Sequence, residues 1–179
     1  SPGNASYVAN ANTRLLTDAG LSAKQIELRL ESIGITPSSL NAICLSHEHS
    51  DHTNGAEYDK SAIKSIYANP PTANTLTRGP KGTEINFHIF QTGAPFSIGN
   101  LTLEPFHIPH DASEPVGFRI SHANTHIGIV TDIGMSTHLV IEKLKGCSCL
   151  VIEANHDVTY LEKPPAPGHP NNRRAADND

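Results

Sequence analysis

The pattern of apolar and polar positions in the first part of the chain predicts short strands around one helix. Residues 7–9 and 14–17 read as two strands joined by a polar Asn-Ala-Asn turn. Between Ser22 and Gly34, apolar residues recur at i, i+4 and i+7, which predicts an amphipathic helix with a capping box at Ser22 and a stop at Gly34. Residues 42–46 form a short apolar run that predicts a buried strand.

The second part of the chain changes from a mixed pattern to a β pattern. Residues 65–68 predict a buried strand and residues 71–77 a short helix. Close-set apolar runs then predict an antiparallel sheet, with strands at residues 85–90, 95–98, 101–108, 116–120 and 127–131. Ser136 is expected to cap a helix through Leu144, followed by a buried strand at residues 149–152. Residues 163–179 are rich in Pro, Asn and charge, so we expect a loop or tail.

Composition favours one globular domain over residues 1–179. Of the 179 residues, 37% are hydrophobic, and no apolar run approaches the ~20 residues of a membrane span, so no membrane association is expected. Three cysteines are too few for a disulfide framework, and Cys147 and Cys149 are expected to be free and buried. With no signal-peptide pattern, this favours a reducing, cytoplasmic compartment. The net charge of -5 mildly disfavours nonspecific nucleic-acid binding.

Histidine is the unusual component of this composition, because the chain has eleven. Residues 47–52 read His-Glu-His-Ser-Asp-His and follow directly on the predicted strand 42–46. In an extended segment, residues i and i+2 point to one side, so His47 and His49 can bind one cation. A turn after them can direct Asp51 and His52 at a second cation. The alternative is a solvated histidine-rich loop, but the buried strand before the motif favours a divalent metal site.

A strand followed by H-x-H-x-D-H and a helix resembles the signature of the metallo-β-lactamase superfamily. The resemblance implies an α+β fold, the four-layer αβ/βα sandwich, with two sheets face to face and helices outside. It also implies two divalent metal ions, which His and carboxylate ligands leave open as Zn, Mn or Fe. His47 and His49 would bind the first ion with a third histidine, and Asp51 and His52 would bind the second.

The resemblance assigns the other ligands further along the chain. His110, in Pro-His-Asp-Ala after the strand 101–108, matches the third histidine, while His107 is a competitor that ordinarily would lie on a strand face. Asp132 ends an apolar strand and matches the carboxylate that bridges the two ions. His169, in a Gly-His-Pro sequence within the predicted tail, resembles the last metal-binding histidine.

Several smaller motifs resemble the YycJ/WalJ-like branch of the superfamily, bacterial proteins described as DNA exonucleases. They lie at residues 1–6, 16–20, 109–112, 115–118, 131–134 and 153–157. Branch members start with a strand before the first of these motifs, so we expect an edge strand to be missing here. They also carry a longer helical segment between the positions of Asp157 and His169. The fold is therefore expected to be incomplete at both ends.

Catalytic roles follow from the same resemblance. Asp132 would bridge the ions and Asp51 would orient the nucleophile, while His156 is a candidate proton donor that equally well could shape a loop. Glu153, Asn155 and Asp157 are expected to support the metal ligands from behind.

These observations predict a metal-dependent hydrolase, most simply a phosphodiesterase or DNA exonuclease that uses a metal-activated hydroxide at a dinuclear site. DNA as partner comes from the resemblance and not from charge. One alternative keeps the two ions but acts on a small-molecule ester, lactone, thioester or β-lactam, because fold does not fix function. A further alternative is an inactive metal-binding remnant domain. The sequence does not indicate an oligomeric state.

Overall fold

The computed structural model describes residues 3–55, 65–77 and 86–153, and these form two five-stranded sheets. The first sheet has the order β1-β2-β3-β4-β5, with strands Ser6–Ala9, Arg14–Thr17, Ala42–Cys44, Ile66–Ala68 and Phe87–Ile89. β1 is antiparallel to β2, and the remaining pairs are parallel. Helices and loops connect these parallel strands, because a parallel pair cannot be joined by a tight hairpin.

The second sheet has the order β10-β9-β8-β7-β6. Its strands are Phe96–Ile98, Leu101–His107, Val116–His122, Thr125–Val130 and Cys149–Ile152, for β6 to β10. β6 to β9 form an antiparallel meander, as the sequence predicted, and the turn between β6 and β7 contains Gly99 with φ 56°. β10 is parallel to β9, because the intervening helix α4 (His138–Leu144) returns the chain to the end where β9 began.

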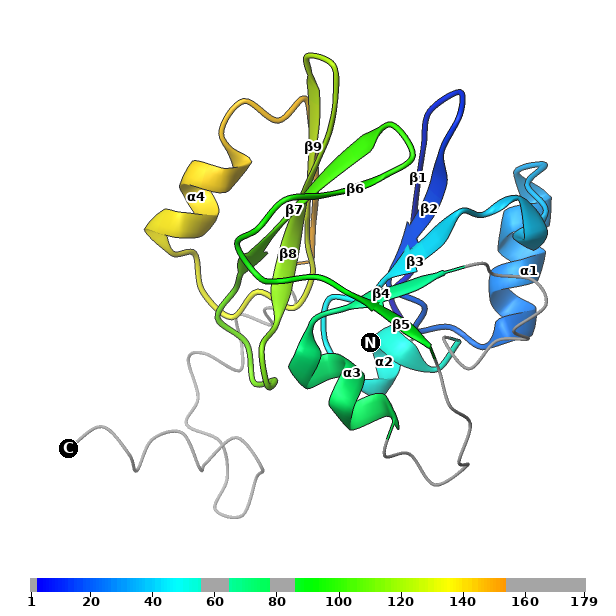
Figure 1. The fold of residues 1–179 in the computed structure, drawn as a ribbon, viewed down its shortest axis with the longest axis horizontal. Coiled ribbons are helices and arrows are strands. Elements are labelled where there is room, and N and C mark those ends of the chain that lie inside the picture. The colour runs from blue at the N-terminus through cyan, green and yellow to red at the C-terminus, as the bar shows by residue number, and fades with distance from the viewer. Residues whose placement is uncertain (1–2, 56–64, 78–85, 154–179) are drawn as a thin grey trace, which may run out of the picture.

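The sheets lie face to face with helices outside, which confirms the predicted sandwich (Figure 1). Side chains of both sheets share the central core, including Leu15 and Cys44 from the first and Leu103 and Phe118 from the second. In the outer layers, α1 (Ala23–Ser32) and α3 (Pro70–Thr77) cover the first sheet, and α4 covers the second. A 3₁₀ turn (Pro37–Ser39) and the short α2 (Ser50–Thr53) complete the elements.

Two helix caps and two strands differ from expectation. The strand predicted at residues 85–90 in the antiparallel sheet is β5, which instead pairs parallel with β4 in the first sheet. Ser22 precedes α1 but makes no side-chain cap, and α4 is capped by Thr137, which accepts from the Val140 N–H, instead of by Ser136. β10 was predicted to be buried, yet all four of its residues are exposed, and Cys149 with them. Among the described residues, β10 is the outermost strand of its sheet and has a neighbouring strand on one side only.

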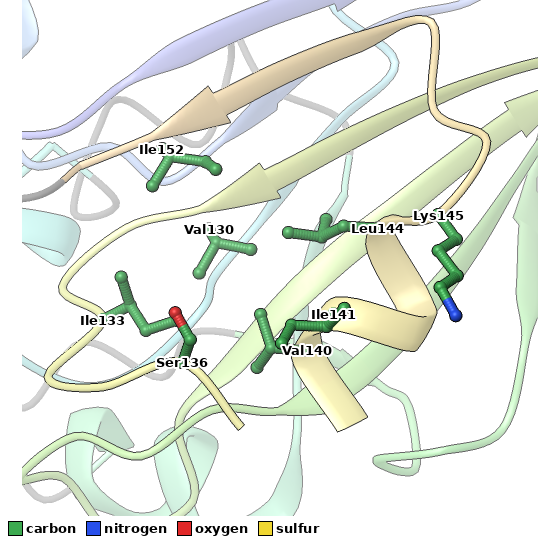
Figure 2. Close-up of a pocket in the computed structure, with 8 residues that line it drawn as sticks. All are labelled: Val130, Ile133, Ser136, Val140, Ile141, Leu144, Lys145 and Ile152. Carbon is green, nitrogen blue, oxygen red and sulfur yellow. The ribbon is translucent and has the colours of Figure 1, made fainter. Parts of the chain in front are cut away.

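The outer face of the second sheet also carries an apolar hollow beside β10. Figure 2 shows Val130 of β9 and Ile152 of β10 directed toward Val140 and Leu144 of α4, with Ile133 closing one end. Ile141, on the same helix, is 48% exposed.

No helix in the described ranges combines the length and apolarity that crossing a bilayer requires.

Candidate metal centre

Three strand ends bring the predicted residues together at one edge of the sandwich. The segment 47–52 follows β3, His110 follows β7 and Asp132 follows β9. β7 and β9 are parallel to each other because each is antiparallel to β8, so their carboxyl ends lie at the same edge. The backbone N–H of Val116 donates to the Ser46 carbonyl at 3.1 Å and thereby connects the two sheets beside the centre.

Two groups of side chains within this centre have the composition of metal sites. The first consists of His47, His49 and His110, and the second of His47, His52 and Asp132. Within each group, one ligand atom from every residue lies within 4.8 Å of the others. In the first group, His49 Nδ1 and His110 Nε2 are 3.1 Å apart. We call the first the three-histidine group and the second the His-Asp group. His47 belongs to both.

A single oxygen of Asp132 faces both groups. Its Oδ2 lies 2.6 Å from Nε2 of His52, 3.6 Å from Nε2 of His47 and 3.8 Å from Nε2 of His110. Asp132 has φ 54°, a left-handed conformation that Asp tolerates better than most residues. The turn after β9 therefore directs this carboxylate inward between the two groups.

A buried carboxylate that sequence reasoning missed fixes the orientation of the imidazoles. Asp18 follows β2 with φ 63° and accepts from the N–H of Ser46 at 2.8 Å and from its hydroxyl at 2.9 Å. His52 Nδ1 donates to Asp18 Oδ2 at 2.9 Å, and His47 Nδ1 donates to the Ser46 hydroxyl at 2.9 Å. His47 thus carries its proton on Nδ1 and presents its Nε2 lone pair to the centre, and His52 does the same once an ion displaces the Nε2 proton that faces Asp132.

The same contacts set opposite pKa shifts on the two buried histidines. Burial, reinforced by the charge of His52, lowers the pKa of His47 to about 3. Burial also acts to lower the pKa of His52, but the hydrogen bond and charge of Asp18, with the charges of Asp132 and Asp51, raise it to about 9. Burial lowers the pKa of His110 as well. His47 and His110 are therefore held neutral, the form that binds a metal ion.

The donor set fits a metal ion. His47 is fully buried, and its Nε2 has no hydrogen-bond partner in the part of the chain that the structure describes. Burying a nitrogen lone pair that no hydrogen-bond donor contacts costs free energy of folding, unless the lone pair binds a cation. Three imidazoles at one position, and two imidazoles with a carboxylate at the other, suit divalent Zn, Mn or Fe.

The remaining predicted residues lie at different distances from the centre. Asp51, in α2, has its Oδ2 3.9 Å from His52 Nε2, next to the His-Asp group but outside it. His107 is exposed at the end of β7 and belongs to neither group. Glu153 follows β10, with its N–H donating to the Val130 carbonyl at 3.0 Å. The predictions for Asn155, His156, Asp157 and His169 fall outside the described residues, as does the tail 163–179.

Glu48, inside the histidine motif, connects it to the loop that carries His110. Its Oε1 accepts from the N–H and the hydroxyl of Ser113, both at 2.8 Å. Burial acts to raise the pKa of Glu48, but these hydrogen bonds outweigh it, and the pKa lies below its usual range. The ionised carboxylate therefore connects the histidine motif to the loop that carries His110.

Comparisons with known proteins agree with this geometry. A family model described as a beta-lactamase superfamily domain matches residues 13–177. An exodeoxyribonuclease YycJ of Bacillus anthracis is 33% identical over 168 residues, which cover 90% of this chain and 62% of the relative. An exodeoxyribonuclease WalJ of Streptococcus pneumoniae is 33% identical over 165 residues, covering 90% and 61%. The chain thus spans less than two thirds of the length of these relatives.

Solved structures share the fold at low sequence identity. A metallo-β-lactamase of Cronobacter sakazakii has a TM-score of 0.66 and 17% identity, covering 83% of this chain and 70% of that one. Zinc-bound PqqB from Methylobacterium extorquens has a TM-score of 0.67 and 14% identity, covering 83% and 58%. These likenesses concern the fold alone.

Proposed function

Since this chain belongs to the metallo-β-lactamase superfamily, we propose that it is a metal-dependent hydrolase that cleaves phosphodiester bonds at DNA ends. The observation that carries the proposal is Asp132 Oδ2, which faces imidazole nitrogens of both groups within 3.8 Å. The similarity to two exodeoxyribonucleases supports DNA as the substrate. Residues 1–179 would act as one domain.

The chain's own residues divide the work of such a centre. His47, His49 and His110 would hold one divalent ion, and His52, Asp51 and Asp132 the second, with His169 as a further ligand. Two such ions would supply an activated water molecule and neutralise the charge of the phosphate. Asp132 would join the two positions, and Asp18 holds His52 in the tautomer that binding requires.

Other residues would serve the substrate and the leaving group. We propose Asp51 to orient the nucleophile, His156 to provide the proton to the leaving oxygen, and Glu153, Asn155 and Asp157 to support the ligands. Six cations that we propose as contacts to the phosphate backbone lie outside the described residues. They are Lys60, Lys64, Arg78, Lys81, Arg173 and Arg174.

The test combines metal analysis with a DNA assay on the full chain. The protein is loaded with Mn or Zn and its metal content measured, then incubated with end-labelled linear duplex and with covalently closed circular DNA. The proposal expects the wild type to release the end label from the linear duplex and to leave the closed circle intact. Asp132→Asn should abolish the release of the label. Hydrolysis of a chromogenic ester, lactone or β-lactam without attack on DNA would contradict it and favour a small-molecule hydrolase. A folded protein that retains no metal would indicate a remnant domain.

A further inference from the structure

The turn before β1 places Asn4 against the centre, and its backbone is fixed on two sides. The N–H of Asn4 donates to the carbonyl of Asp51 at 2.7 Å, and its own carbonyl accepts from the N–H of Gly20 at 2.7 Å. Asp51 lies in α2, directly before His52, and Gly20 lies two residues after Asp18. Asn4 is therefore tied to both segments that position His52.

Two glycines allow this close approach. A Cβ at Gly20 would lie 1.5 Å from the Asp51 carbonyl oxygen and 2.7 Å from the Asn4 nitrogen. A Cβ at Gly3, which has φ 119°, would lie 2.6 Å from the Gly20 carbonyl oxygen. Because larger residues at either position would push the turn away, the backbone specifies where the Asn4 side chain lies.

The side chain of Asn4 points at the atom that the His-Asp group uses. Asn4 Nδ2 lies 3.1 Å from His52 Nε2, which is also the atom that faces Asp132 Oδ2. When an ion occupies the His-Asp group, His52 keeps its proton on Nδ1, toward Asp18, and its Nε2 binds the ion. An imidazole nitrogen that ligates an ion has no lone pair left for the Asn4 amide. The amide must then find another acceptor at the same place.

We propose that Asn4 is a substrate-contacting residue, whose side-chain amide donates a hydrogen bond to an anionic phosphate oxygen beside His52 and Asp132. This inference rests on the proposed phosphodiesterase function and adds a neutral donor to a centre otherwise built from imidazoles and carboxylates. A donor already fixed in place stabilises negative charge that increases in the transition state. Among the described residues, the side-chain contact of Asn4 within the centre is with His52, so we expect its effect on the His-Asp side.

The experiment compares wild type, Asn4→Ala and Asn4→Asp, with Asn12→Ala as an exposed asparagine control on the β1–β2 turn. Metal content, affinity for inorganic phosphate by calorimetry on the loaded protein, and kcat/KM on linear duplex DNA are measured for each. Asn4→Ala is expected to retain wild-type metal content, bind phosphate about 10-fold more weakly and lose on the order of 10²-fold in kcat/KM. Asn4→Asp keeps the side chain's size without the donor, and is expected to weaken phosphate binding at least as much.

Two results would overturn the inference while leaving the proposed function intact. Unchanged phosphate affinity and kcat/KM in Asn4→Ala would show that the amide does not contact the substrate. Loss of an ion in Asn4→Ala would show that Asn4 acts on metal binding. If wild type does not cleave DNA, the proposed function fails on its own. The phosphate titration still decides whether Asn4 contacts an anionic oxygen, because it requires no turnover.

Discussion

The three-histidine group and the His-Asp group share His47 but differ in charge and in the carboxylates that contact their histidines. His49 and His110 add only imidazoles to the first group, and burial holds the pKa of His47 and of His110 below the usual range. His52 and Asp132 bring carboxylate charge to the second group, directly and through Asp18, which raises the pKa of His52 to about 9. Binding of an ion to His52 must therefore displace a proton that nearby carboxylates stabilise.

This difference indicates that the two positions fill separately. The three-histidine group offers neutral lone pairs, whereas the His-Asp group relies on Asp132 and on the Asp18 hydrogen bond. We expect the first ion to be retained when the second is lost, and the second to be retained when the first is lost. The variants below separate the two groups, beginning with the residue that belongs to both.

The largest effect is expected for His47→Ala. Because His47 Nε2 can bind one ion only, its removal leaves two donors in the three-histidine group. The first ion and all hydrolysis should be lost, as with His49→Ala, while His52, Asp51 and Asp132 keep the second ion. Elemental analysis after dialysis measures this, with circular dichroism to confirm folding. His107→Ala, an exposed histidine outside both groups, is the control and should retain both ions. Loss of both ions in His47→Ala would show that the two positions do not fill separately.

Asp132→Asn should separate the groups most clearly. Asn accepts the left-handed backbone at this position, so the turn after β9 keeps its shape while the charge is lost. We expect loss of the second ion, retention of the first, and a fall in kcat on the order of 10³-fold. Metal content and DNA hydrolysis are measured on the same preparation. If both ions remain, Asp132 does not supply the charge on which the His-Asp group depends.

The sequence predicted the residues of both groups but not what orients them. The motif at residues 47–52, His110 and Asp132 could be found because each follows an apolar strand, and strand ends share an edge. Asp18 also ends an apolar strand and lies in the motif at residues 16–20, but no role in the centre was assigned to that motif. Its role depends on contacts with Ser46 and His52, which lie in distant segments and become visible only in three dimensions.

Burial was the feature that apolar patterning predicted least well. Residues 42–44 and 149–152 look alike in sequence, but β3 is central in its sheet and covered on both faces, while β10 is the outermost described strand of its sheet. Periodicity shows which residues can be buried; whether they are depends on the layers next to them. The cap of α4 shows a local version of this limit, because Ser136 and Thr137 are adjacent hydroxyls and only geometry selects Thr137.

Asp18→Asn tests the support behind the His-Asp group. The amide retains the size of the carboxylate and accepts the left-handed φ, but carries no charge to stabilise the His52 Nδ1 proton. We expect affinity for the second ion to fall about 10- to 100-fold, the usual cost of losing such a partner. Competition with a chelator measures each ion's affinity. A larger loss at the first ion would place the main effect of Asp18 on His47, through Ser46.

Ser113→Ala should weaken metal binding at the three-histidine group alone. Its effect is expected to be the smallest of the four variants. The variant removes the hydroxyl that donates to Glu48 Oε1 but keeps the N–H that donates to the same oxygen, so the loop carrying His110 loosens without detaching. One lost hydrogen bond to a carboxylate, partly replaced by water at this exposed position, corresponds to a few-fold change, about 3-fold in first-ion affinity. Chelator competition should show that change with second-ion affinity unaltered. Equal weakening of both ions would show that the loop positions the whole centre, and the two groups would then be one cooperative unit.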